Sequence, residues 1–250
     1  MTKTMSIRER LHAFWSGERP DQIPYTIYQN EWRHTSDDPA WEAMYENGLG
    51  VTWYNRTFDL TPHNVEFDTE TTIENGVQVV RRIQRTPVGE IDAIWRDGWH
   101  STYWLETPED YRVMAYIAEH AEITPAYERY AAFEAELPDW GIAIPVVGRT
   151  PLQTILVDYV GLENFGIHLF TCADEIQMLY DALLNNFRRI VEIVAEGHGF
   201  YISNLENFTA ETLGPRRYKT FLMPVYEECF KILHDAGKIV GSHYDGRTKV

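Results

Sequence analysis

Residues 142–151 read Ile142-Ala143-Ile144-Pro145-Val146-Val147-Gly148-Arg149-Thr150-Pro151, and this stretch decides the fold class. Its first six residues form a short apolar run that predicts a buried strand. The loop that follows ends at Pro151, a residue favoured at the first position of a helix. The stretch therefore predicts a strand, a loop and a helix in direct succession, which is the unit from which parallel sheets are built.

The same unit recurs on both sides of this stretch. The amphipathic pattern over 174–196 predicts a long helix, and the run 200–203 predicts the next strand. A helix expected over 214–236 is followed by a strand over 238–242 that ends at His243. Near the start, a helix over 6–16 precedes a strand over 23–28. This alternation predicts an α/β fold of the (β/α)8 TIM-barrel type.

Two regions depart from the alternation. Residues 64–96 are rich in β-formers around Asn75-Gly76, a strong hairpin signal, and predict a β-meander inserted in an N-terminal, β-rich extension. Residues 108–137 have a helical pattern that Pro125 must interrupt, which predicts two helices. No Gly-x-Gly-x-x-Gly or Walker-type loop follows any expected strand, which disfavours a nucleotide-binding sheet.

Composition narrows the class of protein. The 250 residues are 44% apolar with a formal net charge of −16, which argues against nucleic acid and anionic membranes as partners while leaving room for a local basic pocket. We find no membrane-length apolar run and no secretion signal, so a cytoplasmic location is expected. Cys172 and Cys229 lack Cys-x-x-Cys spacing, so neither a disulfide framework nor an all-thiolate zinc site is expected.

Candidate site residues follow the expected strands, because α/β barrels carry their chemistry at the carboxyl ends of the strands. His243 and Asp245 are two residues apart and can face the same way, as can Asn204 and Glu206. Neighbouring strand ends are adjacent in a barrel, so we expect the two pairs to approach each other. The remaining candidates are Gln29, Trp32 and Arg149.

Several segments, taken in order, resemble the uroporphyrinogen decarboxylase superfamily, in particular its branch of corrinoid and cofactor methyltransferases. They are Gly17-Glu18-Arg19-Pro20-Asp21-Gln22-Ile23-Pro24, Thr86-Pro87-Val88-Gly89, Leu213-Gly214-Pro215, Ala236-Gly237-Lys238 and His243-Tyr244-Asp245-Gly246. The last segment is similar to the family's His-x-Cys-Gly or His-x-Asp-Gly motif. The resemblance implies one barrel domain over 1–250. Only about four barrel strands are expected here, so the sequence looks truncated at about half the barrel, and the exposed sheet edge would favour a homo-oligomer or a longer chain.

The resemblance also implies a reaction and a metal. Such methyltransferases bind zinc, which activates a thiol, and they exchange a methyl group with a corrinoid on a partner protein. His243 and Asp245 occupy the positions of two zinc ligands, with a third ligand either beyond residue 250 or at Glu206. Alternatively, His243 and Asp245 form a metal-free polar site that orients a substrate, or a structural pair that caps the next loop.

The other candidates have roles of their own. Glu206, with Asn204 beside it, is a candidate general base, against the alternative of a solvated loop carboxylate. Arg149 is a candidate for binding a substrate carboxylate in a bidentate manner, against a surface salt bridge. Gln29 and Trp32 are candidates for substrate contact, with packing as the alternative for Trp32.

Three functions are therefore expected. The first is zinc-dependent methyl transfer between a small substrate or thiol and a corrinoid. The second is decarboxylation of a porphyrinogen polycarboxylate, although residues 28–34 hold only one arginine, Arg33, where the family resemblance implies several. The third is a non-catalytic truncated barrel that acts as a binding module.

Overall fold

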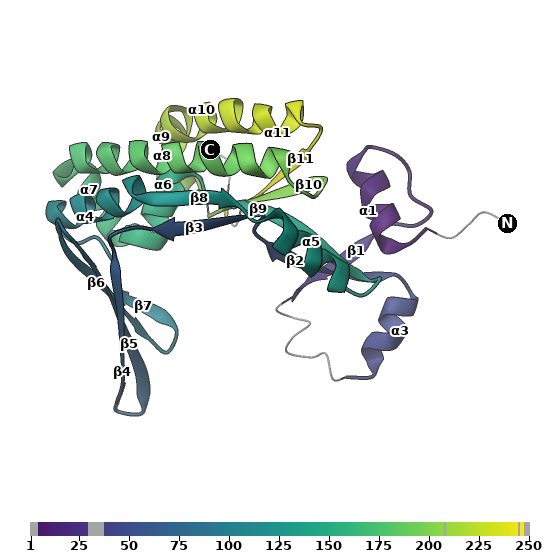
Figure 1. Cartoon of the computed structure of the whole chain (residues 1–250), viewed down its shortest axis with the longest axis horizontal. Coiled ribbons are helices and arrows are strands. Elements are labelled where there is room, and N and C mark those ends of the chain that lie inside the picture. The colour runs from purple at the N-terminus through teal and green to yellow at the C-terminus, as the bar shows by residue number, and fades with distance from the viewer. Residues whose placement is uncertain (1–4, 30–37, 208, 245, 248–250) are drawn as a thin grey trace.

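The computed structural model describes residues 5–29, 38–207, 209–244 and 246–247, and its main feature is a five-stranded parallel sheet (Figure 1). The spatial order of the strands is β1-β2-β9-β10-β11, and every neighbouring pair is parallel. The strands are β1 (Tyr25–Tyr28), β2 (Leu49–Asn55), β9 (Gly141–Gly148), β10 (Tyr201–Glu206) and β11 (Ile239–Tyr244). The predicted α/β class with a parallel sheet is confirmed.

This sheet is curled into a half-barrel, with a concave and a convex face. Helix α1 (Ile7–Trp15) covers the concave face, where its Ile7 and Leu11 pack against Ile142 and Ile144 of β9. The capping box that the sequence predicts at Ser6 is formed, because the Ser6 hydroxyl accepts the Glu9 N–H and the Glu9 carboxylate accepts the Ser6 N–H.

Helices cover the convex face and enclose the main hydrophobic core (Figure 1). Val147 and Ile202, which point outward from β9 and β10, pack into this core. The largest element is α8 (Ala173–Glu196), which confirms the predicted long helix. The other covering elements are α4 (Pro108–Glu119), α6 (Pro151–Thr154), η1 (Ile155–Val160), α7 (Leu162–Thr171), α9 (Ala210–Arg217), η2 (Tyr218–Leu222), α10 (Met223–Val225), η3 (Tyr226–Phe230) and α11 (Lys231–Asp235).

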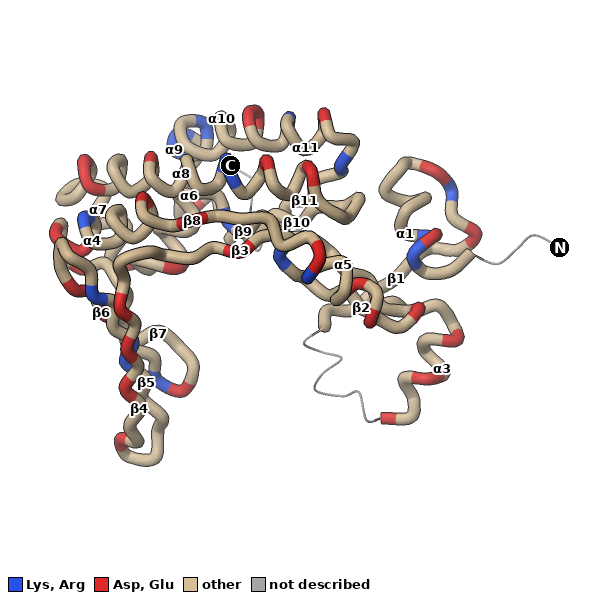
Figure 2. The backbone as a smooth tube through the Cα atoms, in the orientation of Figure 1, with Lys and Arg blue, Asp and Glu red and all other residues tan. Residues whose placement is uncertain are grey.

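Two smaller antiparallel sheets flank the half-barrel. Strands β3 (Phe58–Pro62) and β8 (Ala121–Pro125) form a ribbon beside α8. Strands β4 (Glu66–Glu74), β5 (Val77–Thr86), β6 (Gly89–Arg96) and β7 (Trp99–Thr102) form a meander that projects from the body (Figure 1). Its first turn is the predicted Asn75-Gly76 turn, with both residues at positive φ. The charged residues of β4 are all acidic and those of β5 are all basic, so the meander carries both signs of charge (Figure 2).

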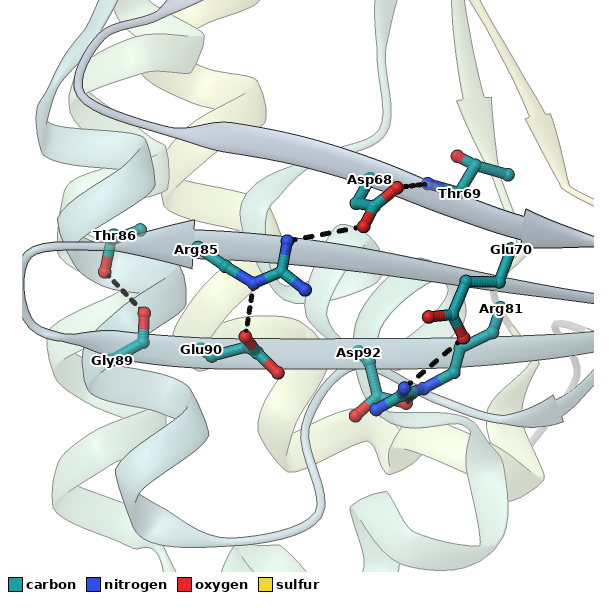
Figure 3. A network of polar contacts seen from close by, with 9 residues as sticks. All are labelled: Asp68, Thr69, Glu70, Arg81, Arg85, Thr86, Gly89, Glu90 and Asp92. Atoms are coloured by element: carbon teal, nitrogen blue, oxygen red, sulfur yellow. Dashed lines mark hydrogen bonds and ion pairs between the residues drawn. The ribbon is translucent and has the colours of Figure 1, made fainter.

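Ion pairs cross one face of this meander (Figure 3). Arg85 of β5 pairs with Glu90 of β6 at 2.6 Å and with Asp68 of β4 at 3.5 Å. Arg81 pairs in the same way with Asp92 at 2.9 Å and Glu70 at 3.5 Å. The arginines of β5 thus join this strand to both of its neighbours, β4 and β6.

The structure corrects the sequence analysis at several elements. Strand β2 was not predicted at all. The predicted helix pair over 108–137 is α4 and α5 (Tyr127–Glu136), but the strand β8 lies between them. The helix expected over 214–236 is divided into α9, η2, α10, η3 and α11, with Gly214 at a φ of 74° inside α9. Among the described residues, no helix is long and apolar enough to cross a membrane.

Candidate functional site

The structure places the predicted pairs Asn204–Glu206 and His243–Asp245 differently from the expectation. Parallel pairing puts His243 beside Leu205 and puts Glu206 beside Tyr244. Successive side chains of a strand point to opposite faces, so Leu205 and His243 share one face and Asn204 and Glu206 share the other. The predicted approach of Asn204 and Glu206 to His243 is therefore wrong.

His243 lies on the concave face at the end of β11 and is exposed. Its ring meets the ring of Tyr28, from the end of β1, edge-on at 6.5 Å between centroids. Tyr28 also lies 5.7 Å from the ring of Tyr54 of β2. Burial raises the pKa of Tyr54. Asp245 and Trp32 lie outside the described residues.

The described part of this site holds one of the two predicted zinc ligands, His243. Glu206, the candidate third ligand, is on the opposite face of the sheet from His243. Among the described residues no group of three His, Cys, Asp or Glu side chains could hold a metal ion.

Asn204 and Glu206 lie on the convex face, at 0% and 1% exposure. The Asn204 amide donates to the Gly148 carbonyl at 2.7 Å and accepts from the Ser242 hydroxyl at 3.1 Å. It thereby ties together the ends of β9, β10 and β11. Glu206 Oε1 accepts the backbone N–H of Thr150 at 3.1 Å. Both residues thus hold the strand ends and the Arg149 loop, and the solvated-loop alternative for Glu206 is excluded by its burial.

The burial of Glu206 in an apolar environment changes the pKa of its carboxyl group. Burial raises its pKa to about 7, and the nearby donor groups of Thr150, Asn204 and Tyr226 oppose the rise. Glu206 Oε2 and the Tyr226 hydroxyl lie near each other in the core, but neither forms a hydrogen bond of ordinary length and angle among the described residues. The carboxylate is therefore close to the balance between its two protonation states at neutral pH.

Arg149 follows β9 and contacts two neighbouring segments. Its Nη1 lies 3.1 Å from Asp158 Oδ1, and its Nε and Nη2 donate to Asn207 Oδ1 at 3.3 and 3.1 Å. Asp158 belongs to η1, a π-helical segment, and such segments are frequent at functional sites. Burial raises the pKa of Asp158, and Arg149 opposes that rise. The salt-bridge alternative for Arg149 is thus present, in a partly buried form.

Arg149 and Asp158 line a cavity of about 340 Å³ at the carboxyl ends of β2, β9 and β10. Arg56, directly after β2, lines it too, and its guanidinium lies 5.7 Å from the Phe58 ring centroid. Within the described residues Arg56 forms no salt bridge. The apolar wall consists of Phe58, Leu60, Val146, Val147, Pro151, Leu183, Phe187, Ile190 and Leu205. Gln29, half-buried after β1, does not line this cavity.

His100 of β7 lies close enough to Asp158 for the two side chains to influence each other electrostatically. It stacks on Tyr103 at 4.3 Å between ring centroids, and its Nδ1 is buried without a hydrogen-bond partner among the described residues. Burial lowers the pKa of His100, and the carboxylate of Asp158 opposes this shift. Sequence patterns do not predict the proximity of His100 and Asp158, because 58 residues separate them in the chain.

Comparisons with family models, with curated proteins and with solved structures found no match to this chain, so the family resemblance rests on the sequence motifs alone.

Proposed function

We propose that this chain is an enzyme that binds a small carboxylated molecule in the cavity between Arg56 and Arg149. The main support is the set of residues that line the cavity. Among the described residues, two guanidinium groups and one carboxylate lie beside an apolar wall, although the whole protein has a net charge of −16. Two arginines against one aspartate make this cavity locally positive, and guanidinium groups bind carboxylates well. The apolar wall favours a ligand with an apolar body.

The position of the cavity also supports the proposal. In open and closed α/β sheets, ligands bind outside the carboxyl ends of the strands. Arg56 follows β2 and Arg149 follows β9, so both guanidinium groups stand at such ends. Asp158, with the nearby His100, offers a group for proton transfer next to the bound carboxylate.

Binding of benzoate tests this proposal, with benzamide as the uncharged counterpart. We expect benzoate to bind and benzamide to bind much more weakly in calorimetric titrations. Arg56→Met and Arg149→Met should each weaken benzoate binding about tenfold, the equivalent of about 1.4 kcal/mol. Arg189→Met, which removes an exposed arginine paired with Glu192, is the matched control. Equal affinity for benzoate and benzamide would refute the carboxylate site.

For the reaction, we propose methyl transfer between the carboxylated molecule or a thiol and a corrinoid carried on a partner, on the strength of the motif resemblance. Demethylation of methylcobalamin by the purified protein and a thiol, followed by its absorbance, is the test. Metal analysis of the wild type and of His243→Ala accompanies it. A protein without stoichiometric zinc under non-chelating conditions contradicts the zinc-dependent form of this proposal.

Decarboxylation of a porphyrinogen polycarboxylate is the second candidate, and the pair Arg56 and Arg149 favours it, because such a substrate carries several carboxylates. Release of CO₂ from a porphyrinogen decides for it over methyl transfer. Benzoate binding without either reaction would support the third possibility, a binding module.

We also propose that the half-barrel is part of a (β/α)8 barrel. Support comes from the curl of the sheet, which brings the ring of Tyr28 on one edge strand to 6.5 Å, between centroids, from the ring of His243 on the other edge strand. Hydrogen exchange of the β11 amides tests it. Closure by further strands protects every amide of β11, whereas an open edge leaves alternate amides in fast exchange.

A further inference from the structure

The sequence at the start of helix α6 is that of a capping box, but the hydrogen bonds of a capping box are not formed there. Thr150-Pro151-Leu152-Gln153 matches the pattern in which the first side chain caps the helix and the fourth accepts the N–H of the first residue. The Thr150 side chain makes no such cap. The Thr150 hydroxyl and both polar atoms of the Gln153 amide are buried without a partner among the described residues.

Glu206 accepts the hydrogen bond that Gln153 would accept in a capping box. The backbone N–H of Thr150, which Gln153 would accept in a closed box, donates to Glu206 Oε1 at 3.1 Å. An ionised carboxylate accepts a stronger hydrogen bond than a neutral amide does. The capping-box sequence thus supplies Gln153 as a second, neutral acceptor for the N–H that the Glu206 carboxylate now accepts.

This N–H belongs to the loop that positions the proposed binding site. Arg149 precedes Thr150, and the helix that begins at Pro151 continues into η1, which carries Asp158. Asn204 holds the other end of the loop through the Gly148 carbonyl at 2.7 Å. A change of acceptor at Thr150 therefore acts on both members of the Arg149–Asp158 pair.

We propose that Glu206 is a positioning residue: its carboxylate holds the Thr150 N–H and thereby the Arg149 loop, and on protonation of Glu206 this N–H passes to Gln153. The closed box would rotate Thr150 and withdraw Arg149 from its present place in the cavity. The structural part of this inference stands alone, and only its effect on binding rests on the proposed function.

The surroundings of Glu206 allow protonation near neutral pH. The titratable groups that face it are Tyr226 from η3 and Tyr218 from η2, whose pKa values burial raises, and Tyr244, its neighbour on β11. Arg149, in the adjoining loop, directs its guanidinium to Asp158 and Asn207. Burial raises the pKa of Glu206 to about 7.

Two substitutions separate this inference from a merely structural role of Glu206. Glu206→Gln removes the charged acceptor, so the Arg149 loop should take its low-pH state at every pH. Gln153→Leu removes the competing acceptor, so the loop should keep its high-pH state at every pH. Glu163→Gln, at an exposed carboxylate of α7, is the control.

The experiment follows the Thr150 amide and the Gln153 side-chain amide by NMR between pH 5.5 and pH 8.5, together with benzoate affinity. In the wild type and the control, both signals should shift with a common midpoint near pH 7, and benzoate should bind about tenfold more weakly at pH 5.5, the loss of about one charge-assisted hydrogen bond. Glu206→Gln should bind weakly throughout and Gln153→Leu tightly throughout.

The outcomes distinguish this inference from the proposed function. If benzoate does not bind to the wild type, the proposed function fails, while the two amide signals still decide the exchange of acceptors. Signals that do not move with pH in the wild type overturn the inference, as does a Gln153→Leu protein with wild-type pH dependence. If Glu206→Gln does not fold, the wild-type titration and Gln153→Leu suffice for this decision.

Discussion

The rings of Tyr28 and His243 lie 6.5 Å apart and nearly perpendicular, although β1 and β11 are the two opposite edges of the parallel sheet. Only a strongly curled sheet brings its edges together in this way. The side chains on its concave face are therefore crowded, and small residues are required where they meet. Gly241 of β11 is such a position, because a Cβ there would overlap the hydroxyl of Tyr201.

Gly241→Ala is expected to lower the free energy of unfolding by about 1 to 3 kcal/mol, the usual cost of overpacking. Tyr201 cannot easily move aside, because its ring stacks on Trp15 at 4.4 Å. Urea denaturation measures the effect. Gly166→Ala, in helix α7 with no atom near the new Cβ, is the control and should stabilise by about 0.5 to 1 kcal/mol. Equal stability of Gly241→Ala and the wild type would contradict the packing of the concave face.

The strands that can be predicted from the sequence are those marked by an apolar run or by flanking glycines and helix patterns. Residues 142–147 are an uninterrupted apolar run, and a helix pattern and glycines precede 201–206. Strand β2 lacks such punctuation on its carboxyl side, where Asn55-Arg56-Thr57 leads straight into β3. Because β2 was missed, Arg56 was missed as well. A search for arginines after every β-rich run would have found it.

The face on which a strand residue points is harder to predict than the strand itself. Asn204, Glu206 and His243 were all placed at the carboxyl ends of strands, and the structure confirms those positions. Their faces depend on the register of β10 against β11, and a shift of one residue exchanges the two faces. This register is a tertiary property, so the sequence could not separate Glu206 from His243.

The raised pKa of Glu206 predicts a specific pH dependence of stability. Its pKa is 4.5 in the ordinary state and about 7 in the folded protein, so the folded state binds the proton more tightly. The free energy of unfolding should then fall as pH rises from about 4.5 to about 7, by about 3 kcal/mol from this group. Glu206→Gln lacks this term, so its stability relative to the wild type should increase by that amount across the window.

Chemical denaturation at pH 4.5, 6 and 7.5 measures this difference. Glu163→Gln, the same substitution at an exposed carboxylate, is measured in parallel as the control. If the stability of Glu206→Gln relative to the wild type is the same at pH 4.5 and at pH 7.5, the pKa of Glu206 is not raised in the folded protein.

The ion pairs of the meander should contribute less to the free energy of unfolding than the buried apolar side chains of the same strands do. Arg85 is 40% exposed, so its pairs with Glu90 and Asp68 are screened by water. Arg85→Met should cost less than about 1 kcal/mol, and the cost should shrink in 1 M NaCl. Ile83→Ala, two residues away in β5 and 2% exposed, should cost about 2 to 5 kcal/mol at either salt concentration. A larger loss for Arg85→Met than for Ile83→Ala would reverse this order.

Asp158 should compete with a bound carboxylate for Arg149. Its Oδ1 lies 3.1 Å from Arg149 Nη1, and among the described residues it is the single carboxylate that lines the cavity. Asp158→Asn keeps the shape of the side chain but removes the negative charge, and Asn207 still orients the guanidinium through bonds at 3.1 and 3.3 Å. Benzoate should therefore bind more tightly to Asp158→Asn, by about three- to tenfold, which corresponds to about 0.7 to 1.4 kcal/mol. Calorimetric titration measures this gain, with Asp174→Asn at an exposed position of α8 as the control. Weaker binding by Asp158→Asn would instead make Asp158 a support that Arg149 needs for its position.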